Sequence, residues 1–326
     1  MKIQDQLHWS HVSDETMSFY RAIGVDYLAI YPAPDASDGV DRSEYWCRTR
    51  ELAETHGLTL WNTAQHGWDS LTLGLADRDA KIEAWITMLR SLAAAGVPTL
   101  GYNFKPVGNF RTPSAIGRGG VRYSTFDYDA WASNPTHHPD KVIDADRLFE
   151  NLVYFLKHVL PVAESLGIRM ALHPDDPPIP EVMGGAARIV SSLDQYARIF
   201  DAVPSPASGM LFCQGCVAEM GEHVPDAIRR LSARDKIVYV HFRNIRGTPR
   251  SFQEVFVDEG QVDMVEAMKT YREVGFRGPF MMDHTPTFPQ SIAGWSGHAY
   301  ANGYIRALIQ AVYGVGPGGA GAEEQG

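Results

Sequence analysis

The sequence predicts a single (β/α)₈ barrel (TIM barrel), an α/β fold in which each of eight parallel strands is followed by a helix. Eight short apolar runs alternate with eight segments whose apolar residues recur at helical spacing, and no linker interrupts this alternation. The length of 326 residues, with 44% hydrophobic and 21% charged residues, suits one globular domain. Four successive apolar runs also end in residues that can bind a metal, as expected where strands deliver ligands to one rim of a barrel.

The first half of the chain contains four of these strand and helix units. The first helix begins near Ser13, which can cap it, while Asp14 and Glu15 suit the positive end of that helix. Gly57 and Gly96 end the next two helices. The predicted strands lie at residues 7–9, 25–31, 58–63 and 97–102, and the later helices of this half lie at 43–56, 77–95 and 148–159.

Between residues 103 and 144 the alternation gives way to a stretch rich in Gly, Pro, Arg and aromatic residues. A loop this long in a compact domain is usually functional or disordered, and its aromatic content favours an ordered lid over a flexible linker. We therefore predict a barrel over residues 1–313 with a lid-like insertion at about 103–144. The Gly-rich, acidic residues 314–326 are predicted to form a flexible tail.

The second half repeats the alternation and carries the candidate metal ligands. The predicted strands lie at 168–172, 209–212, 237–240 and 279–282, and the helices at 193–202, 224–233, 263–274 and 297–312. The four strands end in His173, Cys213, His241 and Asp283. Because the active site of a barrel lies at the C-terminal ends of its strands, we expect these four side chains to meet.

Such a set would form a metal site of borderline softness. Two imidazoles, one thiolate and one carboxylate suit Mn²⁺ or Fe²⁺, and Zn²⁺ also fits, whereas Mg²⁺ or Ca²⁺ would prefer oxygen ligands alone. A single strand-end histidine is more often an ordinary surface or core residue, but four positions at barrel spacing favour a metal site. Cys213 and Cys216 also have the spacing of a redox motif, which belongs to a thioredoxin-like context that this sequence lacks. We interpret Cys213 as a ligand and Cys216 as structural.

Polar residues beside these ligands are candidates for catalysis. His284 is the best candidate for a general acid or base, because imidazole titrates near neutrality; packing beneath a loop is the rival interpretation. Asp175 or Asp176 could orient His173 or a metal-bound water, although a solvated acidic turn is an equally good interpretation of either residue.

Several basic residues are candidates for binding a substrate carboxylate. Arg243 lies two residues after His241, would point to the same side of the strand, and could hold a carboxylate through two hydrogen bonds. The lid-like insertion contains four more residues that could do the same, Arg111, Arg118, Arg122 and Lys105, although most loop arginines are merely solvated.

The charge and composition restrict the kinds of partner. A formal net charge of -10 argues against nucleic acid and anionic membrane, so an anionic substrate would need local lysine or arginine. No apolar run approaches the length of a membrane span, and the first six residues have no signal-peptide character, so the expected compartment is the cytoplasm. Three cysteines are too few for a disulfide scaffold. We expect a small-molecule substrate, and the sequence is compatible with a homo-oligomer.

Several motifs, taken together, resemble the D-mannonate dehydratase family over roughly residues 96–312. The motifs are Gly101-Tyr102-Asn103-Phe104, His173-Pro174-Asp175-Asp176-Pro177-Pro178, Phe212-Cys213, His241-Phe242-Arg243-Asn244, Phe252-Gln253-Glu254 with Val262-Asp263-Met264, and Asp283-His284. The two motifs that begin with His173 and His241 are specific, and the others are weak alone.

The resemblance implies a metal-dependent, xylose-isomerase-like barrel that removes water from a sugar acid, converting D-mannonate to 2-keto-3-deoxy-D-gluconate. It implies that His173, Cys213, His241 and Asp283 bind manganese or iron(II), and that His284 is catalytic. The residues expected on the substrate side are Arg243, Asn244, Tyr102, Asn103 and Arg111. In the hypothesised mechanism a base removes the α-proton, and the enolate expels the β-hydroxyl with acid help from His284 or a tyrosine.

The chain departs from the family pattern after Asp283-His284. A basic Gly-Arg stretch is replaced by Thr285-Pro286-Thr287-Phe288, and the tyrosine of the next segment is displaced, so Tyr300 beside His298 is the candidate to replace it. A histidine that follows the Phe-x-Glu motif is replaced by Val255-Phe256-Val257-Asp258. Two alternatives stay open: a sugar isomerase, epimerase or other eliminase on the same barrel, and a non-catalytic carbohydrate-binding protein.

Overall fold

A closed barrel of eight parallel strands forms the centre of the computed structural model, which describes residues 1–288 and 295–314. The barrel strands are β1 (Ile3–Leu7), β2 (Tyr27–Ile30), β3 (Thr59–Gln65), β4 (Thr99–Tyr102), β7 (Arg169–Leu172), β8 (Ser208–Cys213), β9 (Ile237–His241) and β12 (Phe280–Met281). Around the barrel the order is β1, β12, β9, β8, β7, β4, β3 and β2, and each neighbouring pair is parallel. The predicted fold class is confirmed.

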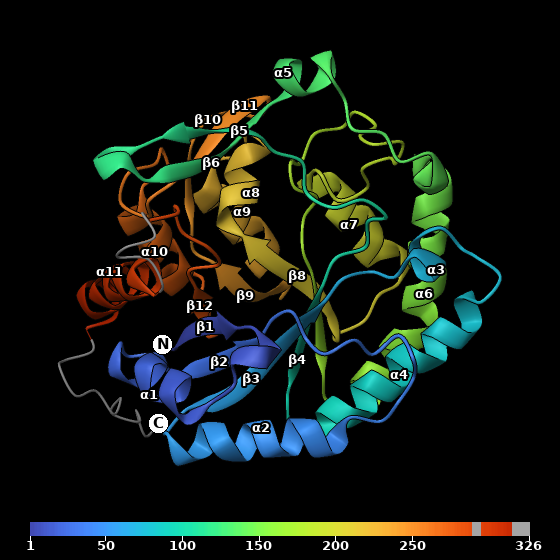
Figure 1. The fold of residues 1–326 in the computed structure, drawn as a ribbon, viewed down its shortest axis with the longest axis horizontal. Helices are drawn as coiled ribbons and strands as arrows, with labels where there is room; N and C mark the ends of the chain where they lie inside the picture. Colours follow the sequence, from blue (N-terminus) through green and yellow to red (C-terminus); the bar gives the residue numbers. More distant parts are fainter. Residues whose placement is uncertain (289–294, 315–326) are drawn as a thin grey trace.

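Helices surround the barrel on its outer side (Figure 1). The longer ones are α1 (Asp14–Ala22), α2 (Ser43–Thr55), α4 (Arg78–Ala94), α6 (Ala145–Ser165), α7 (Leu193–Ala202), α9 (Val224–Ser232), α10 (Met264–Glu273) and α11 (Ser296–Tyr313). Shorter helices are α3 (Asp69–Thr72), α5 (Tyr128–Ser133) and α8 (Gln214–Glu219), and 3₁₀ turns span Trp9–His11, Arg118–Gly120 and Pro139–Lys141. Ser13 caps α1 as predicted, since its side chain accepts a hydrogen bond from the Thr16 backbone N–H.

The first predicted strand, residues 7–9, is wrong: β1 lies earlier and Trp9 is in a 3₁₀ turn. The sequence of β1 contains Gln4 and Asp5, which look like surface residues but are fully buried. Asp5 is stabilised there by α11, because its carboxylate lies 3.0 Å from His298 Nδ1 and accepts a hydrogen bond from Asn302 at 2.6 Å. A local sequence pattern cannot predict hydrogen-bond partners that lie almost 300 residues away in the chain.

A second, four-stranded antiparallel sheet lies beside the barrel (Figure 1). Its strands are β5 (Thr112–Ile116), β6 (Arg122–Asp127), β10 (Asn244–Thr248) and β11 (Ser251–Val255), in the order β10, β11, β6, β5. The sequence analysis did not predict this sheet, because it pairs the lid-like insertion with the hairpin after β9, as in the pairing of Asp127 with Ser251. The sheet thereby ties residues of the insertion to the C-terminal rim of the barrel.

The hydrophobic core has an outer and an inner part. The larger part lies between strands and helices, where Trp85 of α4 and Phe155 of α6 are fully buried with ring centroids 5.0 Å apart. The smaller part fills the barrel interior with residues from β2, β7, β8, β9 and β12, among them Leu211 and Tyr239. Gly101 of β4 makes room there, since a Cβ at that position would lie 2.2 Å from the Tyr239 hydroxyl.

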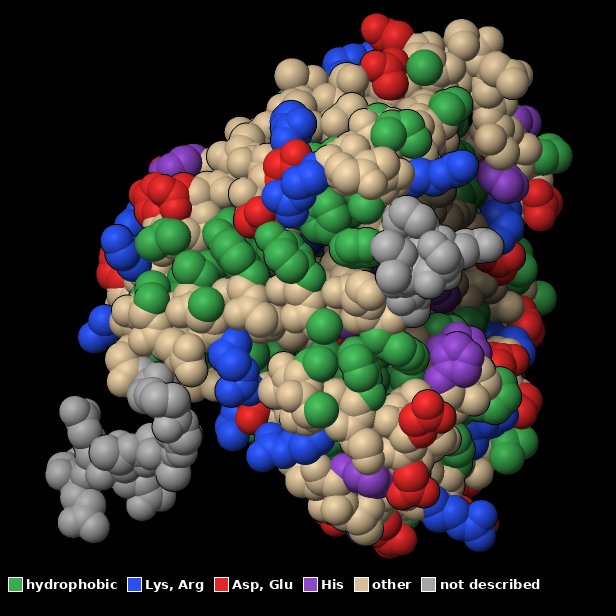
Figure 2. All heavy atoms as spheres, turned by 60° about the vertical axis from the view of Figure 1, so that its left-hand side comes forward, with side chains coloured by type: hydrophobic (Ala, Val, Ile, Leu, Met, Phe, Trp, Pro, Cys, Tyr) green, Lys and Arg blue, Asp and Glu red, His purple; other side chains and the backbone are tan. Residues whose placement is uncertain are grey.

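The surface has mixed charge. On the face shown in Figure 2, lysine and arginine side chains lie among acidic ones. Within the described ranges, no helix combines the length and the apolar character that a bilayer span requires. Of the predicted tail at 314–326, residues 315–326 lie outside the described part of the chain.

Candidate active site

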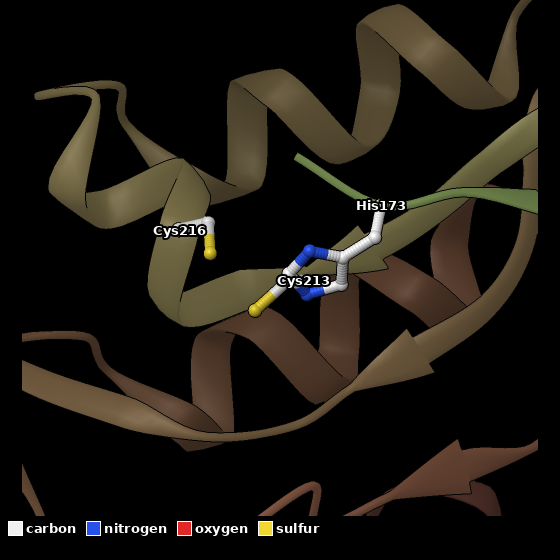
Figure 3. Close-up of side chains that lie close together, drawn as sticks. All are labelled: His173, Cys213 and Cys216. Atoms are coloured by element: carbon white, nitrogen blue, oxygen red, sulfur yellow. The ribbon is translucent and has the colours of Figure 1, made fainter. Parts of the chain in front are cut away.

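The four predicted ligands converge at the C-terminal rim of the barrel. They follow the adjacent strands β7, β8, β9 and β12, and in the register of β8 and β9 Cys213 lies directly beside His241. Two groups that share Cys213 have all their ligand atoms within 4.8 Å of one another, one with His173 and Cys216 and one with His241 and Asp283. In Figure 3 the His173 ring reaches from the end of β7 toward Cys213, while Cys216 comes from α8.

His173 has the orientation typical of a metal ligand. Its Nδ1 lies 2.7 Å from the Pro174 carbonyl oxygen and can donate a hydrogen bond to it. That bond fixes the ring and leaves Nε2 free for an ion, as is usual for histidines that bind metals. The ring centroid lies 5.4 Å from that of His241.

His241 is buried, and neither of its ring nitrogens has a hydrogen-bond partner among the described residues. A buried polar group without a partner is costly, and a metal ion at this position would satisfy the ring. Its Nδ1 lies 3.3 Å from Asp283 Oδ2 without hydrogen-bond geometry. Burial opposes protonation of His241, but the Asp283 carboxylate outweighs it and raises the pKa of His241 to about 9. The donor set therefore fits a divalent ion.

Cys213 and Asp283 have the ionisation state that a ligand needs. Burial opposes ionisation of the Cys213 thiol, but the Cys216 thiol and the Arg243 guanidinium outweigh it and lower the pKa of Cys213 well below its usual value. The pKa of Asp283 is likewise lowered, because His241 and His284 outweigh its burial. Asp283 also has a φ of 67°, which is uncommon for a residue other than glycine and often accompanies functional sites.

Arg243 is not among the residues that line the cavity, so its predicted role as a carboxylate clamp gains no support here and stays a prediction. Its Nη1 lies 2.9 Å from Glu219 and 3.2 Å from Glu254, and its Nε lies 3.2 Å from Asp283. The guanidinium also occupies the space among a third group of acidic and thiol side chains, Asp176, Cys216 and Glu219. The acidic side chains of the protein therefore occupy the hydrogen-bond donors of Arg243. The absence of a side chain at Gly215 leaves room for the guanidinium, since a Cβ there would lie 2.4 Å from Arg243 Nη1.

Arg111 and Asn244 also make contacts within the protein instead of lining the cavity. Arg111 Nη2 lies 2.6 Å from Asp176 and 2.7 Å from Glu254. The Asn244 amide donates to the Val262 carbonyl at 3.0 Å and accepts from the Val262 N–H at 3.0 Å, which fixes a turn. Neither residue has the predicted position against substrate, because partners that are distant in sequence hold both side chains.

Asp175 and Tyr300 lie outside the cavity, so the catalytic roles predicted for them gain no support from these positions. The Asp175 carboxylate is buried, accepts a hydrogen bond from the Val190 N–H at 2.9 Å and lies 3.4 Å from Arg188. Tyr300 is 41% exposed, and its hydroxyl lies 3.4 Å from Arg118 Nη2. Of the two neighbouring aspartates, Asp176 is the one that lines the cavity.

A cavity of about 610 Å³ opens beside the candidate ligands. Of the predicted site residues it is lined by His173, His241, Asp283, His284, Asn103 and Tyr102. The Tyr102 ring, however, packs toward Trp85 in the outer core, with centroids 6.0 Å apart. The His284 side chain is 42% exposed, and its Nε2 lies 3.3 Å from Asp283 Oδ2 and 3.7 Å from Glu254 Oε1.

The sequence analysis missed two residues of the cavity wall, Tyr31 and His66. Lys105, a predicted candidate for binding a substrate carboxylate, does line the cavity. Tyr31 is the last residue of a predicted strand and His66 closely follows another, so the rule that barrel sites lie at strand ends could have found them. They were missed because each is a single polar residue, outside any recognisable motif, in the half of the barrel that carries no predicted ligand.

These features define a class of protein: a (β/α)₈ barrel enzyme with a candidate metal centre at the C-terminal rim. Solved structures show the same fold. The mannonate dehydratase of Streptococcus suis serotype 2 superposes with a TM-score of 0.85 at 25% identity, over 95% of this chain and 94% of that one. A xylose isomerase domain protein of Alicyclobacillus acidocaldarius superposes with a TM-score of 0.66 at 16% identity, over 96% of this chain and 99% of that one.

Sequence comparisons identify the family. The family model for D-mannonate dehydratase (UxuA) matches residues 134–315. The chain is 32% identical over 287 residues to mannonate dehydratase 2 of Halalkalibacterium halodurans, covering 78% of this chain and 81% of that one. It is 31% identical over 252 residues to mannonate dehydratase of Thermotoga maritima, covering 66% and 69%. The chain therefore belongs to the D-mannonate dehydratase family, and the predicted resemblance is confirmed.

Proposed function

We propose that the protein is a metal-dependent hydro-lyase that removes water from D-mannonate, or a closely related sugar acid, to give 2-keto-3-deoxy-D-gluconate. The observation that carries this proposal is the convergence of His173, Cys213, His241 and Asp283 beside a cavity of about 610 Å³, in a chain of this family. The relatives named above are mannonate dehydratases.

The proposed ion is Mn²⁺ or Fe²⁺, with Zn²⁺ as the third choice, because the ligands combine nitrogen, sulfur and oxygen. When bound, such an ion would supply Lewis-acid stabilisation of the negative charge that develops on a sugar acid during elimination. The four side chains come from separate strands, so the barrel itself holds the ligand geometry.

Lys105 is the proposed binding group for the substrate carboxylate. Arg111 and Arg243 are both paired with protein acids, whereas within the described ranges Lys105 has no carboxylate within 4.0 Å. It is only 7% exposed, lines the cavity and donates a hydrogen bond to Asn109. The other lysine of the cavity wall, Lys141, is 2.9 Å from Asp69 and thus already paired. A buried cation free to bind an anion therefore supports an acidic substrate.

His284 is the proposed base that removes the proton next to the substrate carboxylate. It lines the cavity beside Asp283, and its Nε2 lies within 4.0 Å of the carboxylates of Asp283 and Glu254, which hold the ring in place. Its partial exposure lets that proton pass to solvent after each turnover.

The test is an assay of chelator-treated protein, reloaded with Mn²⁺, against a panel of hexonates. We expect a 2-keto-3-deoxy acid from D-mannonate, detected by mass spectrometry as loss of water. A product of unchanged mass with inverted stereochemistry would instead indicate an epimerase. Binding without any product from any hexonate would support a carbohydrate-binding protein and refute the proposal.

A further inference from the structure

Tyr31, His66 and Asn103 form a connected group on the wall of the cavity that faces the candidate metal ligands. They follow β2, β3 and β4, which are neighbours in the barrel, whereas the ligands follow β7, β8, β9 and β12. All three residues line the cavity. A substrate bound between the two walls would have the candidate metal centre on one side and this group on the other.

The hydrogen bonds of Asn103 fix the tautomer of His66. Asn103 Oδ1 accepts a hydrogen bond from the Gly67 N–H at 3.5 Å, which turns the amide nitrogen toward His66, 2.7 Å from Nδ1. An amide nitrogen only donates, so His66 Nδ1 accepts. Burial, with the nearby Lys105 charge, lowers the pKa of His66 and keeps the ring neutral. The single ring proton is therefore on Nε2.

This tautomer leaves the Tyr31 hydroxyl proton free. His66 Nε2 lies 3.0 Å from the Tyr31 hydroxyl oxygen and, being protonated, donates to it. The Tyr31 hydroxyl then points its own hydrogen away from His66. Because Tyr31 lines the cavity, that hydrogen is available to a substrate bound there. Burial, with a contribution from Asp283, raises the pKa of Tyr31 to about 12, so the phenol keeps its proton at neutral pH. Once that proton has left, the hydrogen bond from His66 stabilises the phenolate.

We propose that Tyr31 is the general acid that protonates the departing hydroxyl group of the substrate, and that His66 and Asn103 are positioning residues that hold it. This inference rests on the proposed dehydration. It also assigns separate groups to the two proton transfers that an elimination requires, since His284 lies beside Asp283 on the other wall.

The proposed step balances as follows. His284 takes the C2 proton, and the electron pair of that C–H bond enters the carboxylate group, giving an enolate that can also take a proton back at C2. The enolate electrons then form the C2–C3 double bond as the C3–O bond breaks. The leaving oxygen takes the Tyr31 proton and departs as water. The resulting enol then becomes the ketone by losing its hydroxyl proton to solvent and gaining a proton at C3. Proton exchange with solvent restores His284 and Tyr31, so the net change is the loss of one water.

The experiment compares elimination with isotope exchange at C2 in D₂O. Because His284 is 42% exposed, the proton that it takes can be replaced by deuterium before it returns. Tyr31→Phe should lower the rate of product formation by about 10²–10⁴-fold. Deuterium should still enter C2 of the recovered substrate, and Mn²⁺ content and substrate Kd should stay unchanged. His284→Ala should lose both exchange and elimination.

Two sets of control variants separate this role from a structural one. Tyr27→Phe alters a tyrosine at the opposite end of β2, whose ring stacks on Trp61 at 5.7 Å, and should leave both readouts unchanged. His66→Gln keeps a donor near the Nε2 position and should retain most of the elimination rate. His66→Leu removes the donor and should lose elimination while exchange continues.

The outcomes distinguish this inference from the proposed function. Wild-type turnover of a hexonate to a 2-keto-3-deoxy acid tests the function alone. If the wild type is active and Tyr31→Phe eliminates water at the wild-type rate, Tyr31 is not the acid. If Tyr31→Phe loses exchange together with elimination, binds substrate more weakly, or loses metal, the inference is equally overturned. A wild type that exchanges the C2 proton but forms no dehydrated product refutes both.

Discussion

Cys213 is the proposed ligand that most narrows the choice of metal, because a thiolate is softer than the oxygen ligands preferred by Mg²⁺ and Ca²⁺. Cys213→Ser should lower Mn²⁺ affinity by about 10–100-fold or more while the fold is retained. Metal titration and elemental analysis measure the effect. Cys47→Ser, at a partly exposed cysteine of α2, is the matched control. Unchanged metal stoichiometry and affinity in Cys213→Ser would remove Cys213 from the ligand set.

His241 makes metal binding depend on pH. Its pKa of about 9 in the metal-free protein means that it is protonated at neutral pH and must release that proton to bind an ion. The pKa values of Cys213 and Asp283 are lowered, so these ligands are already ionised. Between pH 6 and 8 the Mn²⁺ affinity should therefore rise by roughly tenfold per pH unit, as for the release of one proton. Metal titrations at several pH values measure this slope, and an affinity independent of pH would contradict it.

Lys105 is the residue on which recognition of the substrate carboxylate depends. Lys105→Met should raise the Kd for D-mannonate by about 10–100-fold, since a hydrogen bond to a charged group contributes about 1.5–3 kcal/mol. Binding of the corresponding uncharged amide should change much less. Direct titration of the Mn²⁺-loaded protein gives both values. Lys157→Met, at an exposed lysine on α6, is the control. Equal losses for acid and amide would mean that Lys105 only shapes the cavity.

Among the secondary-structure elements, the hairpin of β10 and β11 supplies an acidic partner for both Arg111 and Arg243. Its Glu254 lies 2.7 Å from Arg111 and 3.2 Å from Arg243, and its Asn244 fixes the turn at Val262. Because the hairpin pairs with β6, the lid-like insertion and the rim of the barrel form one structure. That the insertion acts as a lid over the substrate stays a prediction.

The cap of α10 allows a test of stability separate from catalysis. The Asp263 carboxylate accepts hydrogen bonds from the Val265 and Glu266 N–H groups, both at 2.9 Å. Asp263→Ala should lower the free energy of unfolding by about 1 kcal/mol, measured by urea denaturation, with kcat unchanged. Lys269→Ala, on the exposed face of the same helix, should have an effect within about 0.5 kcal/mol. Equal stability of Asp263→Ala and the wild type would show that the cap contributes nothing.

At the scale of the whole molecule, the candidate metal centre joins four strands whose ligands span residues 173–283. An ion bound only by the folded barrel should therefore stabilise it, by about 2.7 kcal/mol at a free concentration of 100 times Kd. Thermal unfolding with Mn²⁺ or with chelator measures the shift in Tm. In Cys213→Ser the Mn²⁺-dependent shift should shrink at the same metal concentration. An equal shift in both proteins would indicate that Mn²⁺ stabilises through another site.

Local sequence patterns were enough to predict the barrel and the strand ends that carry the candidate ligands. Alternating apolar runs and amphipathic helices report local periodicity, and residues at the ends of parallel strands share a rim whatever their distance along the chain. His173, Cys213, His241 and Asp283 are therefore brought together as the strand order requires. Strand β1 was misplaced because Asp5 is buried against α11, a contact that periodicity does not record.

Which polar side chains face the cavity could not be predicted without the packing of the folded chain. Arg243, Arg111 and Asp175 looked like substrate or catalytic residues, but protein groups distant in sequence hold them away from the cavity. Tyr31 and His66 looked ordinary, yet two neighbouring strands bring them to the cavity wall, where the predicted candidate Lys105 also lies. The physical reason is that the direction of a polar side chain depends on which partners satisfy its hydrogen bonds and charge, and those partners are chosen by the packing of the whole barrel.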